Sequence, residues 1–255
     1  MFLTSLAHMM DRVFDPSQLP LTILFRDYVS GTTGTWTCQT SAGPSSASSS
    51  LGPMPGVSTI CPNQGTALNH HGVASFNQAA TTGNSMQQTG TMANFIQPKS
   101  VSGWILINPA EIAKVQYLWM DDGVAGSGFF STGIRASGNF RVVLNGTVIA
   151  EIGPLRLNQW QLCTFRYDGA FCQVGINCPP GFSGSVSASV PFTNVINSLS
   201  TSNVRLGRTS AAPGSFFTGS VAELGVSNQI LTDQNYWDLI GYCNQRYALS
   251  LRMGV

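Results

Sequence analysis

Two carboxylates, Asp121 and Asp122, stand side by side, but their spacing does not suit acid–base catalysis. Hydrolysis of a glycosidic bond needs two carboxyl groups across a cleft, about 5 to 9.5 Å apart, whereas neighbours on a strand point to opposite faces of the sheet. Glu223 lies in an apolar segment. A carboxylate there can accept hydrogen bonds from loop backbone or pair with Arg205 or Arg208, which is a structural alternative to a catalytic role. The sequence therefore predicts no catalytic residue and no enzyme.

Candidate metal ligands are few. His70 and His71 are adjacent, but a zinc site takes three or four ligands, and His8 is the only other histidine in the chain. A pair of loop histidines is the simpler interpretation. Asp121 and Asp122 precede a glycine and form a weak candidate calcium site, because hard cations bind oxygen ligands in loops. A solvated Asp-Asp-Gly turn explains the same residues, so no cofactor is expected beyond this weak calcium candidate.

The six cysteines are spread over the chain without a metal-type pairing. Cys172 and Cys178 would lie roughly 20 Å apart along an extended strand, too far for a disulfide. We expect buried free thiols, and Cys38 and Cys61 remain open as a pair that a disulfide can join. Neither a Gly-x-Ser-x-Gly run nor a phosphate-binding glycine loop is present, so the sequence offers no recognisable nucleophile.

Aromatic side chains near glycine-rich loops form the candidate surface for a sugar or a partner chain. Trp36, Phe130 and Phe216 are predicted as these surface contacts. Phe130 follows Phe129, and Phe216 precedes Phe217; adjacent residues of a strand place one ring on each face of a sheet. We expect one ring of each pair in the core and the other exposed or at an interface.

Composition excludes several classes of function. Hydrophobic residues make up 43% of the 255 residues and charged residues 9%, with a net charge of +1. A disordered chain is less hydrophobic and more charged. No run of lysine and arginine predicts nucleic acid or anionic lipid as a partner, and no segment approaches the ~18 apolar residues of a membrane span. Weak self-repulsion suits packing in an assembly, and a neutral isolated domain fits the composition equally well.

Residues 1–15 form a distinct segment. Large apolar side chains recur there at three- and four-residue spacing, which predicts one face of a short helix. They are Phe2, Leu3, Leu6, Met9, Met10 and Val13. Asp15-Pro16 then ends the helix, and the segment lacks the basic start of a secretion signal. The apolar face packs either on its own domain or on a partner chain. We predict an arm whose Phe2, Leu6 and Met10 contact a partner.

From residue 16 to residue 251 the pattern predicts one domain of many short strands. Runs rich in Val, Ile, Phe, Tyr and Trp end at turn residues, as in sandwiches of two antiparallel sheets. The predicted strands are 21–25, 73–77, 92–96, 103–107, 115–120, 129–135, 139–144, 147–152, 161–167, 170–176, 186–190, 204–207 and 216–226.

The connections between these strands carry signals of their own. Asn145-Gly146 and Asp168-Gly169 predict tight type I′ hairpins, because both dipeptides tolerate positive φ angles. Residues 29–56, rich in Ser, Gly, Thr and Pro, are predicted as one long loop. A helix over 233–247, capped by Thr232, should close the domain. The domain is predicted to end at residue 251, and residues 252–255 form a tail.

A recurring set of motifs runs through the second half of the domain. Trp160 precedes a strand that ends in Tyr167-Asp168-Gly169. Leu206-Gly207-Arg208 follows, and then Gly219-Ser220-Val221-Ala222-Glu223-Leu224 leads toward the closing helix. This order resembles the concanavalin A-like, laminin-G-like jelly-roll domains. In the first half, Gly34-Thr35-Trp36 and Val73-Ala74-Ser75-Phe76-Asn77 resemble members found in tailed phages and bacteria. The resemblance implies an all-β jelly roll of two antiparallel sheets.

The resemblance also implies a role. Similarity to tailed-phage virion proteins implies a non-enzymatic head decoration, head fibre or tail-associated adhesin, located on a virion assembled in the host cytoplasm. Its partners would be copies of itself, other virion proteins and a host-surface glycan; a cell-surface or extracellular location is the alternative. A carbohydrate-binding lectin module and a glycan hydrolase remain as rivals. Glucanases with this sandwich carry a Glu-x-Asp-x-x-Glu strand, which this sequence lacks.

Overall fold

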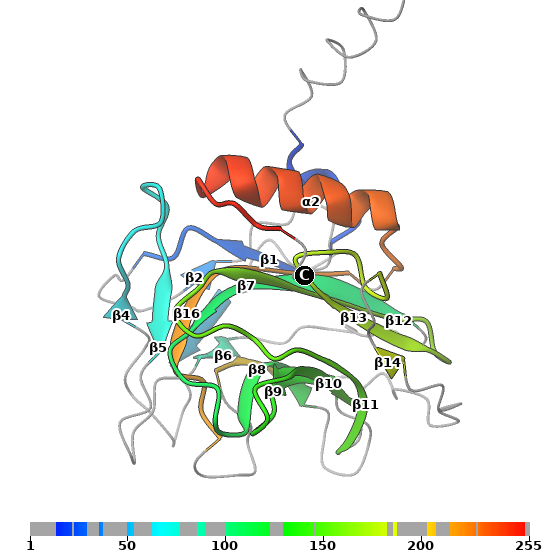
Figure 1. Ribbon diagram of the computed structural model, residues 1–255. Coiled ribbons are helices and arrows are strands. Elements are labelled where there is room, and N and C mark those ends of the chain that lie inside the picture. Colours follow the sequence, from blue (N-terminus) through cyan, green and yellow to red (C-terminus); the bar gives the residue numbers. More distant parts are fainter. Residues whose placement is uncertain are drawn as a thin grey trace, which may run out of the picture.

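The computed structural model shows a sandwich of two antiparallel sheets with a helix lying across the outer face of one of them (Figure 1). The structure describes residues 14–21, 23–29, 36–37, 50–53, 63–76, 86–89, 100–122, 130–144, 146–182, 186–187, 203–207, 215–227 and 229–252. Residues 1–13 lie outside this set, so the predicted helical arm with Phe2, Leu6 and Met10 stays a prediction.

Among the described residues, seven strands form the sheet under the helix, which we call the helix-side sheet. Their order is β13 (Cys172–Ile176), β12 (Gln161–Tyr167), β7 (Val101–Pro109), β16 (Gly219–Ser227), β5 (Ala74–Phe76) and β4 (Asn63–Gln64), and β1 (Ile23–Arg26) also pairs with β16. A 3-10 turn, η1 (Pro16–Gln18), precedes β1.

The opposite sheet, which we call the distal sheet, has nine strands in the described part of the chain. Their order is β14 (Val186–Ser187), β11 (Thr147–Ile152), β10 (Phe140–Leu144), β9 (Phe130–Ile134), β8 (Gln116–Asp122), β15 (Asn203–Leu206), β6 (Met86–Thr89), β3 (Ser50–Pro53) and β2 (Trp36–Thr37). The predicted two-sheet architecture is thereby confirmed.

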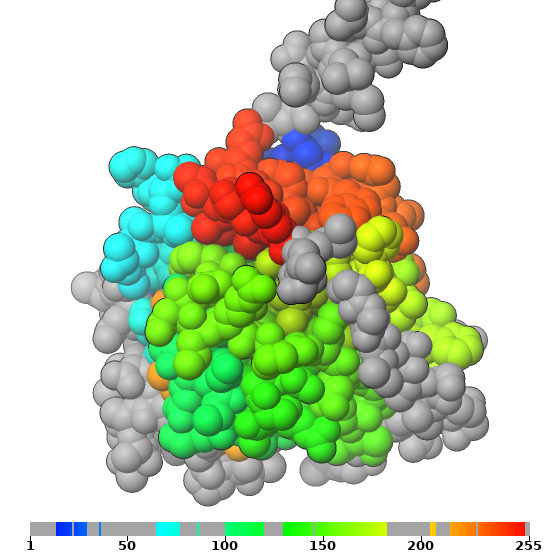
Figure 2. Space-filling view, viewed as in Figure 1, coloured from blue at the N-terminus to red at the C-terminus, as the bar shows by residue number. Residues whose placement is uncertain are grey.

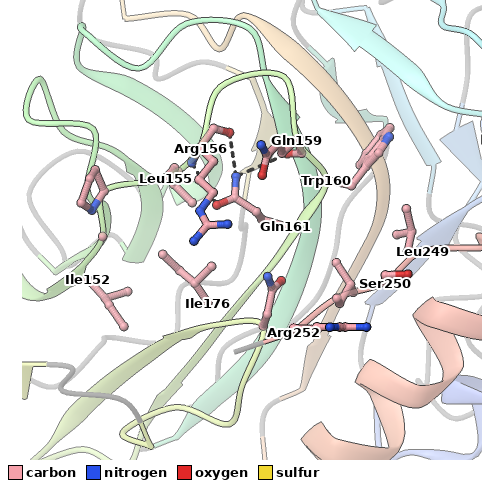
Figure 3. Close-up of a pocket in the computed structure, with 14 residues that line it drawn as sticks. Ile152, Leu155, Arg156, Gln159, Trp160, Gln161, Ile176, Leu249, Ser250 and Arg252 are labelled. Carbon is pink, nitrogen blue, oxygen red and sulfur yellow. Dashed lines mark hydrogen bonds between the residues drawn. The ribbon is translucent and has the colours of Figure 1, made fainter. Parts of the chain in front are cut away.

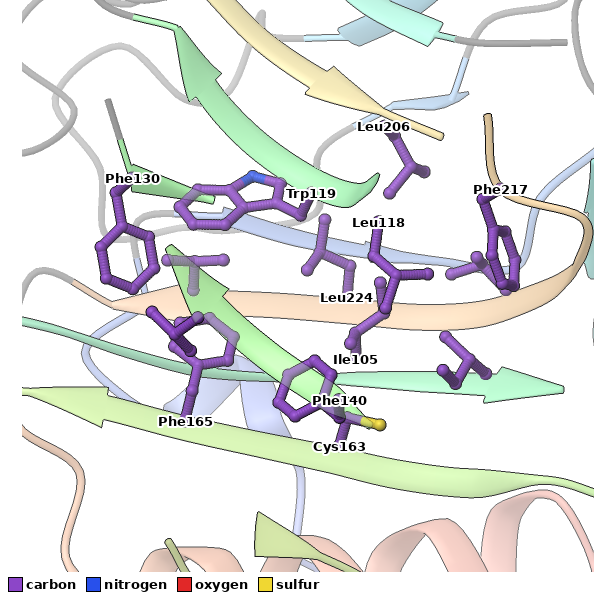
Figure 4. Close-up of a cluster of buried hydrophobic side chains, with 14 of the residues drawn as sticks. Ile105, Leu118, Trp119, Phe130, Phe140, Cys163, Phe165, Leu206, Phe217 and Leu224 are labelled. Carbon is purple, nitrogen blue, oxygen red and sulfur yellow. The ribbon is translucent and has the colours of Figure 1, made fainter. Parts of the chain in front are cut away.

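Strand β7 is buried on both faces because it separates two hydrophobic cores. Ile105 and Ile107 join the core between the sheets, which Figure 4 shows around Trp119 and Phe165. Alternate residues point the other way, and Trp104 packs in the second core beneath the helix. Burial on both faces explains why residues 104–107 of β7 form a continuous apolar run rather than an alternating pattern.

A β-bulge in β16 changes which residues face the helix. The register between β16 and β7 shifts between Val221 and Glu223. Val221 and Leu224 belong to the core between the sheets, whereas Ala222 belongs to the core under the helix. The extra residue therefore lets Glu223 point to the same side as Ala222, and the bulge delivers a carboxylate into the apolar layer under the helix.

The closing helix α2 (Asp233–Arg246) forms as predicted. The Thr232 side chain accepts the Asn235 backbone N–H, and the Asn235 side chain accepts the Thr232 N–H, which makes a capping box. One face of the helix is buried on the helix-side sheet: Tyr236, Leu239, Ile240, Tyr242 and Cys243. Figure 2 shows the helix and the following residues, orange to red, as a continuous cap on this side of the molecule.

The two predicted hairpins differ in outcome. Strands β10 and β11 pair up to Leu144 and Thr147, which leaves the predicted two-residue connection, and Gly146 has φ 81°. Strands β12 and β13 instead pair up to Tyr167 and Cys172, so the second connection has four residues rather than two. The Asp168 carboxylate accepts two backbone N–H groups of this loop, at 2.8 and 2.6 Å, and this bonding stabilises the wider turn.

The prediction of one continuous loop over 29–56 was wrong. Strands β2 and β3 lie within it and pair with each other, and β3 pairs further with β6. Both strands are short and rich in Ser, Thr and Gly, so they show little alternation of apolar and polar residues. The predicted strand at 92–96 lies outside the described residues.

Four of the six cysteines are described, and all four are buried free thiols: Cys163, Cys172, Cys178 and Cys243. This confirms the prediction that Cys172 and Cys178 are not bonded to each other. Cys38 and Cys61 lie outside the described residues.

Native protein should therefore leave these four thiols unmodified by a water-soluble alkylating reagent, while denatured protein should react at all four. Burial raises the pKa of Cys163, Cys172 and Cys243, so the reactive thiolate is depleted as well as inaccessible. Peptide mass spectrometry after timed alkylation measures this. Rapid native labelling of Cys163 would contradict the described packing.

Candidate functional site

The candidate functional site is a cavity of about 890 Å³ at one end of the sandwich. Its walls come from the loop after β11, the first residue of β12, the end of β13 and the segment after α2 (Figure 3). The lining residues are Ile152, Gly153, Pro154, Leu155, Arg156, Gln159, Trp160, Gln161, Ile176, Asn177, Leu249, Ser250, Leu251 and Arg252. The sequence motifs did not indicate this site.

The loop wall is held by one buried amide side chain, that of Gln161. Its Oε1 accepts the Arg156 N–H at 3.0 Å, and its Nε2 donates to the carbonyls of Arg156 at 2.9 Å and Gln159 at 3.3 Å (Figure 3). Leu155 adds an anchor, because its side chain is buried in the core. Gln161 and Leu155 therefore fix the backbone that carries Arg156 and Trp160, and the side chains of these two residues remain available to a ligand.

The opposite wall is fixed by two asparagines. The Asn177 side chain accepts the Leu162 N–H at 2.8 Å and so locks the end of β13 to β12. The Asn244 side chain, on α2, accepts the Leu251 N–H at 2.7 Å and donates to the Leu251 carbonyl at 3.3 Å. The two bonds of Asn244 place Arg252 at the cavity, although it is far in sequence from the loop on the other side.

The cavity is cationic and contains one large aromatic side chain. Arg156 and Arg252 are exposed, and neither forms an ion pair with any residue that the structure describes. No aspartate or glutamate is among the described residues that line it. Trp160 is half-buried and packs partly against the core under the helix. A half-buried ring beside hydrogen-bond donors is the kind of surface that holds one face of a sugar.

Glu223 lies apart from this cavity, in the apolar layer under α2. Three donors reach its carboxylate: Trp104 Nε1 at 3.1 Å, the Tyr242 hydroxyl at 3.0 Å and the Tyr247 hydroxyl at 2.7 Å. Arg26 donates to the Tyr242 hydroxyl at 3.0 Å. The structural role expected for Glu223 fits this bonding. The partner expected at Arg205 was wrong, because Arg26 is the arginine whose charge acts on Glu223, and Arg208 lies outside the described residues.

Burial raises the pKa of Glu223 above its ordinary value of 4.5, although Arg26 and the three hydrogen bonds favour the charged form. Desolvation is the largest of these effects. The carboxylate has no exposure to solvent and does not border the cavity, so we assign it no role in binding.

The structure overturns the three aromatic surface contacts predicted from the sequence. Trp36, Phe130 and Phe216 are 2%, 0% and 5% exposed. Trp36 packs between Phe25 and Tyr28 and donates its Nε1–H to the Arg26 carbonyl. Phe130 is the inward-facing residue at the start of β9. Phe216 precedes β16 rather than lying in it, so the strand alternation that would have exposed one ring of the pair does not apply.

The metal candidates gain no support. Asp121 and Asp122 form the last two positions of β8 rather than a turn. Among the described residues, no group of three or more His, Cys, Asp or Glu is placed to hold a metal ion. His70 and His71 lie in a tight turn, as the loop interpretation predicted, and His71 Nδ1 is 2.8 Å from Asp27 Oδ1.

Comparisons with known proteins support the class of fold, a β-sandwich. No protein-family model and no curated protein matches the sequence. A mutant Trypanosoma rangeli sialidase matches with a TM-score of 0.55 and 11% identity, over 89% of this chain and 33% of that one. Domain 4 of AbnA, an arabinanase from Geobacillus stearothermophilus in complex with arabinotriose, matches with a TM-score of 0.53 and 15% identity, over 86% and 98% of the two chains.

The receptor-binding domain of a botulinum neurotoxin C/D mosaic matches with a TM-score of 0.55 and 10% identity, over 87% of this chain and 51% of that one. This chain thus spans about a third of the sialidase and half of the toxin chain. At these identities the likeness establishes the sandwich fold and leaves the activity to be argued from the site. Within the described residues, no helix is long and apolar enough to cross a membrane.

Proposed function

We propose that this chain is a non-enzymatic, lectin-like attachment module that binds a glycan in the cavity at Trp160. The observation that carries the proposal is the cavity itself, whose lining includes a half-buried indole and two exposed arginines that lack ion pairs within the described chain. The indole can stack on the apolar face of a sugar ring. The guanidinium groups can donate hydrogen bonds to hydroxyl oxygens.

The distribution of carboxylates supports binding without hydrolysis. Glycoside hydrolysis takes a pair of carboxyl groups beside the bond that is cut, and no carboxyl side chain is among the lining residues that the structure describes. Glu223 is enclosed by its three donors beneath α2. The fold is shared with a third of a sialidase chain and with domain 4 of an arabinanase, but a shared fold does not transfer the activity of those proteins to this chain.

We extend this proposal to the setting in which the module works: the virion of a tailed phage, as a head decoration, head fibre or tail-associated adhesin. Support comes from the sequence resemblance over residues 16–251 and from the low surface charge. The partners would be other copies of the chain and other virion proteins. Immunogold labelling of purified particles tests this setting, and label confined to the host-cell surface would contradict it.

Binding is tested on a glycan array with the full chain, followed by calorimetric titration of the glycans that bind. Trp160→Ala should weaken binding about tenfold or more, because one stacked ring contributes on the order of 1 kcal/mol beyond its buried area. Arg156→Gln and Arg252→Gln should weaken it as well, and both side chains are exposed enough for folding to be preserved.

Phe182→Ala is the matched control, since Phe182 is 56% exposed, is not among the lining residues and contacts Trp237. The glycan should be recovered intact after prolonged incubation. Binding that survives Trp160→Ala and both arginine variants unchanged would place the site elsewhere, and cleavage of the glycan would refute the non-enzymatic role.

A further inference from the structure

The outer face of the distal sheet carries a buried arginine, Arg141. It lies in β10 between Phe140 and Val142, and both of these side chains belong to the core between the sheets. Alternation along the strand therefore turns Arg141 to the opposite face. Its neighbours in register are Gly133 on β9 and Glu151 on β11.

The guanidinium of Arg141 is held in place. It reaches past Gly133, which has no side chain, to the ring of Tyr117 on β8, and its Cζ lies 5.2 Å from the ring centroid. Arg141 is 8% exposed. A cation over an aromatic ring loses orientational freedom without using its N–H donors, so the contact fixes the group and leaves its hydrogen bonds unmade.

Two of those donors are buried and unpaired. Arg141 Nε and Nη2 have no hydrogen-bond partner in the described part of the chain. They lie on one edge of the guanidinium, the edge that binds a carboxylate through two parallel hydrogen bonds. The neighbouring Glu151 is engaged elsewhere, because its Oε2 is 2.9 Å from Arg135 Nη1.

A second unpaired donor lies beside the first. Ser131 is two residues before Gly133 on β9, so its side chain is on the same face of the sheet, diagonal to Arg141. It has no exposure, and its Oγ has no partner in the described part of the chain. Buried charged and polar groups without partners are costly, and an apolar residue at position 141 would remove that cost. A ligand that accepts the unpaired hydrogen bonds of Arg141 would offset the cost of burying this arginine.

We propose that Arg141 and Ser131 form a second binding site, for the carboxylate of an acidic saccharide, on the outer face of the distal sheet. Arg141 Nε and Nη2 bind the two carboxylate oxygens, and the Ser131 hydroxyl donates to one of them. The site is separate from the cavity at Trp160, since none of its residues lines that cavity. The carboxylate is argued from the guanidinium edge, whereas the choice of a saccharide rests on the proposed function.

The test is a titration of the ¹⁵N-labelled full chain followed by NMR of the arginine Nε–H resonances. Through-bond assignment identifies Arg141 in the unmodified protein. Glucuronate should shift the Arg141 Nε resonance saturably, whereas glucose, its uncharged counterpart, should not. Acetate, a carboxylate without the sugar, should need a concentration about tenfold higher for the same shift. An equal response to acetate would overturn the assignment to a saccharide.

Variants separate the geometry from the charge. Arg141→Lys keeps the positive charge but loses the two-donor edge, so glucuronate should bind about tenfold more weakly or worse. The matched control is the double variant Arg135→Gln with Glu151→Gln. It removes the exposed ion pair of the same face without freeing a carboxylate for Arg141, and it should leave the affinity unchanged. Trp160→Ala should also leave it unchanged, which distinguishes this site from the cavity. If a variant fails to fold, the titration of the unmodified chain decides. An Arg141 Nε resonance that no carboxylate moves would overturn the proposal.

Discussion

Replacing Glu223 by alanine is expected to lower the free energy of unfolding by about 3 to 5 kcal/mol, because one member of a buried charged network is removed and its partners stay behind. Trp104 Nε1 and the Tyr247 hydroxyl would lose the acceptor that they share. Arg26 would keep Asp15, 3.1 Å away, but lose the nearby Glu223 carboxylate. Urea denaturation of purified protein measures the change.

Glu151→Ala is the control for that experiment. Glu151 also lies in a strand and pairs with an arginine, Arg135, but both side chains are partly exposed, at 30% and 51%. An exposed ion pair typically contributes about 1 kcal/mol or less to stability. The free energy of unfolding of Glu151→Ala should therefore be close to that of the wild type. A loss below about 1 kcal/mol for Glu223→Ala would show that the carboxylate is dispensable to the fold.

Glu223→Gln adds a pH dependence whose sign is fixed by burial. The raised pKa means that the folded state binds the Glu223 proton more tightly than the unfolded state. The stability that Glu223 contributes is therefore complete below its ordinary pKa of 4.5 and declines as the pH rises through the raised value. Glutamine cannot titrate. As the pH rises above about 4.5, the free energy of unfolding of the wild type should therefore fall relative to that of Glu223→Gln.

Gly225→Ala is expected to destabilise the protein by about 3 kcal/mol, the upper part of the usual cost of overpacking a core. A Cβ at position 225 would lie 2.2 Å from Cη2 of Trp104, its cross-strand neighbour. The indole would have to move, and with it the hydrogen bond to Glu223. Near-ultraviolet circular dichroism should report the loss of the fixed tryptophan environment, and thermal unfolding should report the destabilisation.

The same substitution at Gly241 provides the comparison. Gly241 lies within α2, and a Cβ there meets nothing within 4 Å. Alanine favours a helix over glycine by about 1 kcal/mol, so Gly241→Ala should raise the melting temperature slightly. If Gly225→Ala were tolerated equally well, Trp104 would have room that the structure does not show.

The elements with strong local signals could be predicted from the sequence. Long strands such as β12 and the capped helix α2 were placed to within a residue, since each carries its own periodicity and end signals. Strands β2 and β3 were missed, because two and four residues rich in Ser, Thr and Gly do not establish a period.

Neither candidate site could be predicted, because each depends on contacts between distant segments. Trp160 was noted only as the start of a strand motif, and nothing in the sequence places Arg252 beside it. Arg26 reaches the neighbourhood of Glu223 through the pairing of β1 with β16. One local signal was available for the second site: Arg141 interrupts the apolar strand Phe140 to Leu144, and a charge in such a position marks either a solvent-facing residue or a functional one.

The two walls of the cavity are synthesised at different times. During synthesis on the ribosome, residues 152–177 emerge first, and they can pair as β11, β12 and β13 as soon as β7 and β10 are available. Residues 249–252 emerge more than seventy positions later and dock only through Asn244 of α2. The sandwich can therefore begin to fold during translation, while the cavity stays open on one side until the helix has formed. A nascent chain would be partly folded before it is able to bind.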